Sequence, residues 1–231
     1  EDVTPARGFK TIHAIAPMIP VITALMTVAV IPFGDGLYAT DINAAVLYLL
    51  AVNSLGVYGV TLGGWASNSK YSLLGGLRAA AQMISYELPM GMAIASCILF
   101  AGSLSMIDVV NSQEVWWNIF RNPIGAVIFI VAAFAEANRT PFDLVEAEQE
   151  LVGGFHTEYS GMKFGMFFLA EYMHVMIGSM LITTFFFGGY HLPFAGYWLP
   201  EMGSMAKAIL DVSVFTLKTF FWAFVYIWVR W

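Results

Sequence analysis

The sequence predicts an all-α polytopic membrane protein with about six transmembrane helices. Of its 231 residues, 59% are hydrophobic and only 11% are charged, and the mean hydropathy is +0.72. Soluble domains carry about 25% charged residues. The apolar residues also gather in runs of about 20, the length that spans the ~30 Å hydrocarbon core of a bilayer. These runs lack the alternating polarity of membrane barrel strands.

Six segments qualify as membrane spans by length and apolar content. We expect them at residues 15–33, 44–63, 81–104, 123–137, 164–189 and 205–229. The fourth is short and begins after Asn122, so it either includes the apolar residues 115–120 or lies tilted. The Gly59-x-x-x-Gly63 spacing predicts close contact with a neighbouring helix. Since the sequence shows no internal repeat and no low-complexity linker, residues 1–231 are expected to form a single integral membrane domain.

The positive charges indicate the orientation of the spans, because Lys and Arg concentrate in loops on the cytoplasmic side. Arg121 and Lys207 fall on one side of the predicted spans, and Lys218 falls inside a span. The remaining Lys and Arg residues fall on the side that holds the N-terminus: Arg7, Lys10, Lys70, Arg78, Arg139, Lys163 and Arg230. This distribution predicts that both ends of the chain face the cytoplasm.

Composition and motifs exclude several classes of function. The net charge of −6 opposes binding to nucleic-acid phosphates. The single cysteine, Cys97, provides neither a disulfide framework nor a cysteine-ligated cluster. Glu171 and His174 have the Glu-x-x-His spacing of di-iron bundles, but such bundles need two copies of that motif. Since the sequence also lacks a glycine-rich phosphate loop and a nucleophile motif, we expect no metal, no bound cofactor and no catalytic residue in this chain.

Ionisable residues inside the predicted spans are candidates for a proton-coupling path, and they are Glu87, Glu136, Glu171, Asp211 and Lys218. An ionisable side chain inside the bilayer costs at least about 2.5 kcal/mol and by default marks a pathway or a relay. At 1.5 Å per residue, the three glutamates fall at a similar depth in the cytoplasmic half, and Lys218 falls near the middle of its span. The alternative is structural, since each carboxyl can pair with a nearby donor and Lys218 can pair with Asp211 on the same helix face.

The loop at residues 139–162 combines acidic and apolar side chains. Thr140-Pro141 is typical of a helix start, and Gly153-Gly154 marks the end of that helix. The charged candidates in this loop are Arg139, Asp143, Glu146, Glu148, Glu150 and Glu158. A run of charges is often only a solvated helix face. The interleaved apolar residues predict instead a helix that packs against another part of the molecule.

The loop and its flanking spans carry a pattern that is far more specific than any short motif. It reads AEANRTPFDLVEAEQELVGG from residue 135, EYSG from residue 158 and FFLAEY from residue 167, and it continues with GWASNSKY from residue 64 and RAAAQMISYE from residue 78. This pattern resembles the H-subunit family in the membrane arm of bacterial respiratory complex I, the proton-translocating NADH:quinone oxidoreductase. The resemblance covers nearly the whole chain.

The resemblance implies a fold of eight transmembrane helices, of which this chain holds the second to the seventh. It implies a subunit without a redox centre of its own, which forms part of the quinone cavity with its acidic loop and begins the coupling path with its buried carboxylates. Quinone is then the substrate, while NADH, FMN and iron–sulfur clusters belong to partner subunits. The implied partners are the other membrane-arm and hydrophilic-arm subunits and the lipid bilayer. The implied location is the bacterial inner membrane, or an organellar inner membrane.

Two alternative functions stay open at this point. A membrane-bound hydrogenase or a formate hydrogenlyase contains a homologous subunit but uses no quinone. A secondary transporter also has carboxylates inside the membrane, but it places them at the midplane between matched repeats, whereas the acids here lie toward one side. Copurification with flavin and iron–sulfur subunits would exclude the transporter, and a quinone-site inhibitor would distinguish the other two.

Overall fold

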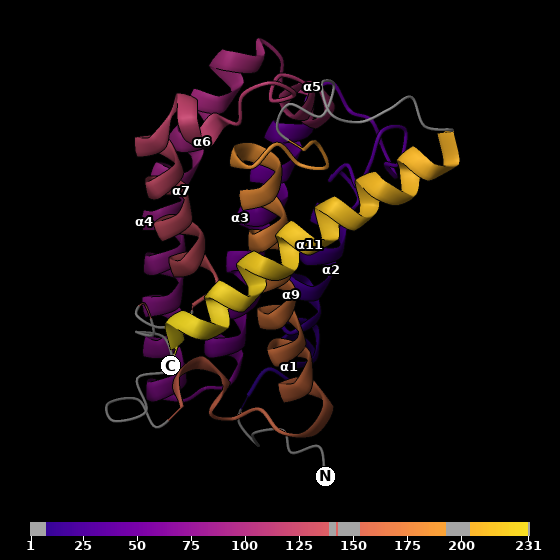
Figure 1. The fold of residues 1–231 in the computed structure, drawn as a ribbon. Coiled ribbons are helices and arrows are strands. Elements are labelled where there is room, and N and C mark those ends of the chain that lie inside the picture. The colour runs from indigo at the N-terminus through magenta and orange to yellow at the C-terminus, as the bar shows by residue number, and fades with distance from the viewer. Residues whose placement is uncertain (1–7, 139–141, 143–152, 193–203, 231) are drawn as a thin grey trace.

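The computed structural model describes residues 8–138, 142, 153–192 and 204–230, and within these residues the fold is an all-α bundle (Figure 1). The helical segments that are long and apolar enough to cross a bilayer are Lys10–Val28, Ala45–Ala66, Lys70–Ala101, Gly161–Phe186 and Met205–Val229. A shorter apolar helix is Pro123–Glu136. The prediction of an all-α membrane bundle is therefore confirmed.

The first span consists of α1 (Lys10–Ile15) and α2 (Met18–Val28). The long helices that follow are α3 (Ala45–Ala66), α4 (Lys70–Ala101), α7 (Pro123–Glu136), α9 (Gly161–Phe186) and α11 (Ser204–Arg230). Short helical segments lie in the connections, and these are α5 (Met106–Asn111), α6 (Asn118–Arg121) and the 3-10 turn η1 (Gly154–His156).

α4 departs furthest from the predicted boundaries, because it begins at Lys70 rather than at residue 81. Its 32 residues make a helix about 48 Å long, well beyond the ~30 Å hydrocarbon core. The added turns pack closely: a Cβ on Gly75 would lie 2.6 Å from the Phe155 backbone nitrogen, beside η1, and Gly76 faces Gly64 of α3. The apolar run thus marks the membrane part of the helix, and packing against α3 and η1 extends it.

The fourth predicted span, residues 123–137, corresponds to α7, and the preceding α6 is a separate helix. α6 ends at Arg121, and Asn122 interrupts the helix with a φ of −140°. The Asn122 side chain then caps α7, since its Oδ1 accepts a hydrogen bond from the Gly125 nitrogen at 3.0 Å. α7 has 14 residues and is about 21 Å long. The apolar residues 115–120 therefore do not lengthen this span.

Small residues allow the helices of the bundle to approach one another. At Gly59 in α3, an added Cβ would lie 2.5 Å from Pro20 Cδ and 3.1 Å from the Ala16 carbonyl oxygen. Gly63, one turn further along α3, faces the Phe167 ring of α9. α3 is thus held between the first span and α9.

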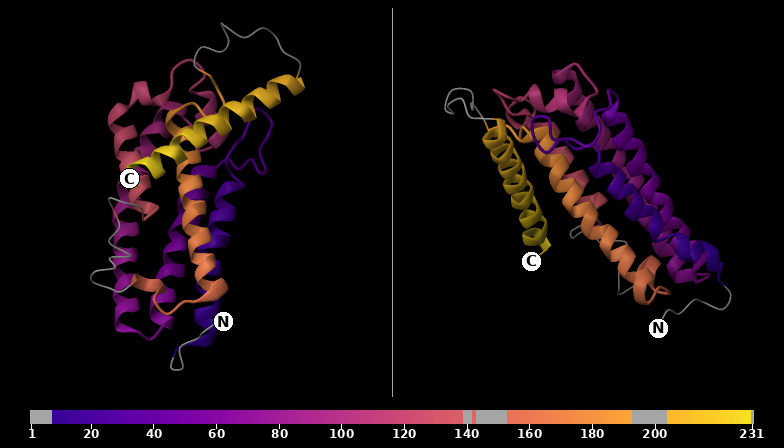
Figure 2. Two further views of the ribbon diagram at one scale, coloured as in Figure 1. Left: turned by 60° about the horizontal axis from the view of Figure 1, so that its bottom comes forward. Right: turned by 90° about the vertical axis from the view of Figure 1, so that its right-hand side faces the viewer.

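α11 crosses the bundle obliquely, lying over α9 (Figures 1 and 2). Its second half reaches α7, where the buried Tyr226 ring stacks on Phe134 with 3.9 Å between the ring centroids. The Tyr226 hydroxyl lies 2.7 Å from the position of a Cβ on Gly178 of α9. A glycine at this point of α9 therefore permits the contact with α11.

The fold makes the predicted orientation testable with introduced cysteines. Ser69, before α4, and Thr157, after η1, lie at the end of the bundle that holds the N-terminus, whereas Ser112, after α5, lies at the opposite end. Cysteines at Ser69 and Thr157 should react with an impermeant thiol reagent only from the cytoplasmic side, and one at Ser112 only from the other side. The native Cys97 is buried and serves as the background control. Labelling from the reverse sides would contradict the charge-based orientation.

The close packing at Gly59 predicts that even an added methyl group lowers the stability of the protein. The Gly59→Ala substitution should destabilise the protein by about 1–3 kcal/mol, because the new methyl group overlaps Pro20. Thermal denaturation of the purified complex measures the effect. Gly91→Ala in α4 is the matched control, since no atom lies within 4 Å of a Cβ at that position. Equal stability of the two variants would show that the α2–α3 contact is not tightly packed.

Candidate functional site

Two adjoining cavities lie inside the bundle, and they share the lining residues Pro20, Met83, Glu136 and His174. The first has a volume of about 50 Å³ and extends along α9 toward Phe155 and Phe167. The second has a volume of about 20 Å³ and lies against α3 and α4. Each has room for at least one water molecule. A path for protons between ionisable groups therefore has space inside this bundle.

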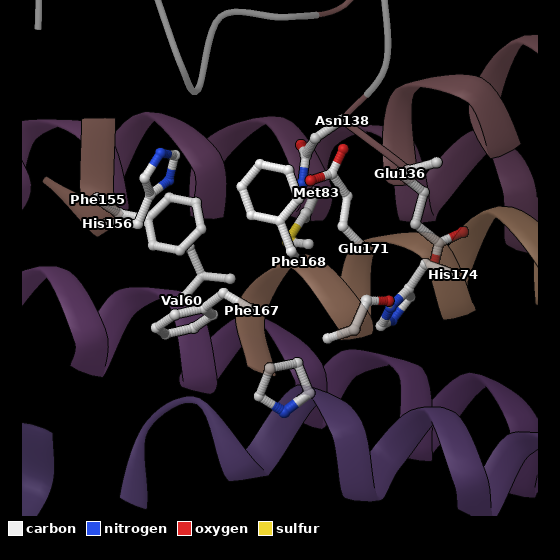
Figure 3. A pocket seen from close by; sticks show the side chains of 13 residues that line it. Val60, Met83, Glu136, Asn138, Phe155, His156, Phe167, Phe168, Glu171 and His174 are labelled. Atoms are coloured by element: carbon white, nitrogen blue, oxygen red, sulfur yellow. The ribbon is translucent and has the colours of Figure 1, made fainter. Parts of the chain in front are cut away.

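The cavities bring together three acidic residues that are far apart in the sequence. Glu136, the last residue of α7, lines both cavities, while Glu171 of α9 lines the first and Glu87 of α4 lines the second. Figure 3 shows Glu136, Glu171 and His174 grouped at one end of the first cavity, with Phe155 and other aromatic residues at the opposite end. The similar depth expected from the sequence thus corresponds to proximity across three helices.

Two consecutive residues of α3 form hydrogen bonds with two of these carboxyl groups. Asn53 Nδ2 donates a hydrogen bond to Glu136 Oε1, and Ser54 Oγ contacts Glu87 Oε1. Ser54 Oγ also lies 3.0 Å from the Leu50 carbonyl oxygen. A hydroxyl has one hydrogen, so Ser54 Oγ donates to only one of these two oxygens at a time. Asn53 and Ser54 therefore place polar groups of α3 beside the carboxyl groups of Glu136 and Glu87.

His174 is a site residue that we considered in the sequence only as a metal ligand. Its Nδ1 lies 2.7 Å from the Ala170 carbonyl oxygen. A carbonyl only accepts hydrogen bonds, so Nδ1 carries a hydrogen and Nε2 of the neutral ring has a lone pair. Nε2 lies 3.9 Å from the position of a Cβ on Gly56, on the side of α3. The spacing from Glu171 was the available signal, because residues three apart lie on one helix face.

Gln82 holds the end of α7 in place. It was not identified from the sequence as a site residue. The Gln82 side chain is buried. Its Nε2 lies 2.8 Å from the Ala135 carbonyl oxygen, 2.9 Å from the Phe142 carbonyl oxygen and 3.1 Å from Asn138 Oδ1. These contacts tie the backbone on both sides of Glu136 to α4. Gln82 is thus a positioning residue for the central carboxylate.

The other two candidate residues in spans, Asp211 and Lys218, lie at the far end of the bundle. Lys218 Nζ donates to the carbonyl oxygens of Phe187, Gly189 and His191 at 2.8, 2.9 and 2.6 Å. These carbonyls follow the last turn of α9, about 24 Å along the helix from Glu171 at 1.5 Å per residue. Lys218 therefore satisfies unpaired carbonyl groups where α9 ends and lies apart from the glutamates.

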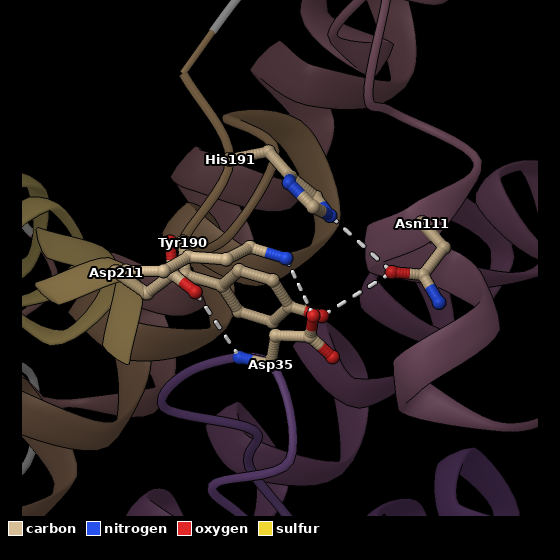
Figure 4. Close-up of polar contacts among 6 residues, drawn as sticks. Asp35, Asn111, Tyr190, His191 and Asp211 are labelled. Carbon is tan, nitrogen blue, oxygen red and sulfur yellow. Dashed lines mark hydrogen bonds and ion pairs between the residues drawn. The ribbon is translucent and has the colours of Figure 1, made fainter. Parts of the chain in front are cut away.

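Asp211 belongs to a polar network at the same end (Figure 4). Its Oδ2 accepts a hydrogen bond from the Asp35 nitrogen at 3.4 Å, and Asp35 Oδ2 pairs with Lys207 Nζ at 2.7 Å. The hydrogen bond and the charge of Lys207 lower the pKa of Asp35. Nearby, the Tyr190 hydroxyl donates to Asn111 Oδ1 at 3.2 Å. The network ties the start of α11 to the connection between α2 and α3.

Most of the acidic-loop candidates lie outside the described residues, namely Arg139, Asp143, Glu146, Glu148 and Glu150, as does the predicted helix that begins at Thr140. Glu158 is described and is exposed. The adjacent Tyr159 is buried and stacks on His13 with 3.9 Å between ring centroids. The part of the loop next to α9 is therefore packed against α1. Among the described residues, no group of three or more His, Cys, Asp or Glu side chains is arranged to hold a metal ion.

Comparison with known proteins identifies relatives along the whole chain. A family model described as NADH dehydrogenase matches residues 1–231. NADH-quinone oxidoreductase subunit 8 of Rhodothermus marinus is 57% identical over 240 residues, covering 100% of this chain and 70% of that protein. The H subunit of the NADH-quinone oxidoreductase of Salinibacter ruber is 55% identical with the same coverage, and that of Leptospira biflexa is 47% identical over 250 residues, covering 100% of this chain and 69% of that protein.

The contacts of Lys218 predict which substitutions the protein tolerates. Lys218→Met removes the charged donor from three carbonyl groups and should destabilise the complex by about 3 kcal/mol or more. Lys218→Arg keeps the charge and the donors but cannot release a proton, so it should retain stability and ion translocation. The measurements are thermal stability and ion translocation of the purified, reconstituted complex. Loss of translocation in a stable Lys218→Arg variant would indicate that Lys218 relays protons.

Proposed function

We propose that this chain couples the reduction of quinone to ion translocation. The chain belongs to the NADH dehydrogenase family and is a membrane subunit of NADH-quinone oxidoreductase. The proposed substrate is quinone, which the names of the chain's relatives include. The chain forms part of the cavity that binds the quinone. The cofactors NADH, FMN and iron–sulfur clusters belong to partner subunits of the hydrophilic arm. The relatives are bacterial, and the proposed location is the bacterial inner membrane.

The observation that carries this proposal is the convergence of Glu87, Glu136 and Glu171 on two adjoining cavities. Three carboxyl groups from three helices are costly in the membrane, and a subunit that served only as an anchor would have no use for them. Carboxyl groups that line shared cavities also influence one another, because ionisation of one disfavours ionisation of the next. A change of charge at one end of the group is thereby passed to the other.

The direction of coupling follows from the position of the site. The first cavity reaches Phe155 and His156, next to the acidic loop at the end of the bundle that holds the N-terminus. We place the quinone cavity against that loop, with Arg139, Asp143, Glu146, Glu148, Glu150 and Glu158 in its wall. Reduction of quinone draws protons or moves the loop, and the changed potential acts first on Glu171 and Glu136. Glu87 then receives the change through the second cavity.

The family membership and the names of the relatives favour this function over the two alternatives. A secondary transporter has no place among the subunits of NADH-quinone oxidoreductase. The homologous subunit of a hydrogenase is a closer alternative, but relatives that share about half of their residues with this chain carry quinone in their names. Sensitivity of the purified complex to a quinone-site inhibitor supports the choice of quinone directly.

Substitution of each glutamate by glutamine tests the coupling role. Glutamine keeps the size and most of the hydrogen bonding but cannot titrate. Glu87→Gln, Glu136→Gln and Glu171→Gln should each lower both quinone reductase activity and ion translocation by about tenfold or more in the reconstituted complex. NADH oxidation by an artificial acceptor should be unchanged.

The matched control is Glu114→Gln, an exposed glutamate at the far end of the bundle. It should leave quinone reduction and ion translocation unchanged. Full activity in all three buried variants would contradict a coupling role. Tolerance of glutamine combined with loss of assembly on alanine substitution would mark the carboxyl groups as structural pairs.

A further inference from the structure

We propose that His174 carries protons between the two carboxyl-lined cavities, accepting them at Nε2. The proposal rests on the proposed coupling function and adds to it a residue and a route. Among the described residues, Glu136 and His174 are the ionisable side chains that line both cavities. A proton that moves from Glu171 to Glu87 through these cavities therefore passes Glu136 or His174.

The backbone of α9 holds the ring in the form that can accept a proton. The hydrogen bond to the Ala170 carbonyl oxygen, at 2.7 Å, fixes the hydrogen on Nδ1. The lone pair of the neutral ring is then on Nε2, which faces α3 near Gly56. A ring held through one nitrogen, in cavities that carboxyl groups also line, is the arrangement of a proton-shuttling histidine.

The groups that face His174 provide a donor and an acceptor. Glu171 lies one turn earlier on the same helix, Glu136 belongs to α7 and Glu87 belongs to α4. The residues that α2 and α3 contribute around the ring are not ionisable, and they are Pro20, Asn53, Gly56 and Val57. A protonated Glu171 transfers its hydrogen to Nε2, directly or through a water molecule, which leaves a carboxylate and an imidazolium. The imidazolium then passes the proton to the carboxylate of Glu136, which becomes neutral as the ring returns to its starting charge.

Histidine suits this position because the nitrogen that has a lone pair in the neutral ring carries a hydrogen in the imidazolium, so one atom can both accept and donate the proton. An imidazolium between carboxylates is stabilised by their charge, and a neutral ring is favoured when they are protonated. The charge of His174 therefore follows the state of its neighbours. A glutamine or asparagine at this position would keep the hydrogen bonding but would interrupt the transfer.

The test is the His174→Asn substitution in the complete complex reconstituted in vesicles. The asparagine amide can still donate to the Ala170 carbonyl oxygen, so the helix contact is kept. Quinone reduction and ion translocation should fall about tenfold or more, and the pH profile of the rate should change, because one of the groups that take up protons is lost. A purely structural side chain would not control that pH profile. His174→Gln serves as a second variant, and His191→Asn, at the far end of the bundle, is the matched control and should behave like the unchanged complex.

The outcomes separate this inference from the proposed function. Normal coupled activity and an unchanged pH profile in His174→Asn or His174→Gln, combined with loss of activity in Glu136→Gln, would overturn the role of His174 alone. Normal activity in both the histidine and the glutamate variants would overturn the coupling function itself. Failure of both histidine variants to assemble would assign the ring a packing role and would also overturn the proposal.

Discussion

The polar contacts that α3 makes with carboxyl groups on its neighbours connect α3 to α4 and α7 around the two cavities. A carboxyl group inside an apolar bundle needs hydrogen-bond partners, and Asn53 and Ser54 supply them to Glu136 on α7 and to Glu87 on α4. Because Asn53 and Ser54 are consecutive, one turn of α3 fixes the positions of two other helices. The glycine at position 59, which brings the first span against α3, completes the wall around the same cavities.

Polar groups are concentrated at two levels of the molecule, and α9 connects them. At one level, Glu171 and His174 face the cavities between the helices. At the other, the carbonyl groups that follow α9 bind Lys218, and the network of Asp35, Lys207 and Asp211 holds the start of α11. α9 therefore takes part in both levels, and it also packs against α11 along the oblique crossing in Figure 1.

Much of the fold could be predicted from the sequence, because apolar length alone identifies a span. The second and sixth predicted spans agree with α3 and α11 within a few residues. The similar depth of the glutamates was also readable, since their helices run alongside one another. Lys218 lies near the middle of α11, but counting along the chain could not show that its contacts are with the carbonyl groups that follow α9. Asn53, Gln82 and His174 were not recognised because a single polar residue on an apolar helix does not reveal which neighbour it faces.

The central claim is that the three glutamates around the two cavities change protonation together in response to quinone reduction, with Asn53 of α3 as the hydrogen-bond donor to Glu136. The most direct measurement is the infrared difference spectrum between the quinone-reduced and oxidised states of the reconstituted complex, in the region where protonated carboxyl groups absorb. We expect a change in that region which disappears in Glu136→Gln and shifts when Asn53 is replaced by Leu, since Asn53 donates to Glu136. A spectrum that shows the same carboxyl change in both variants would contradict the claim.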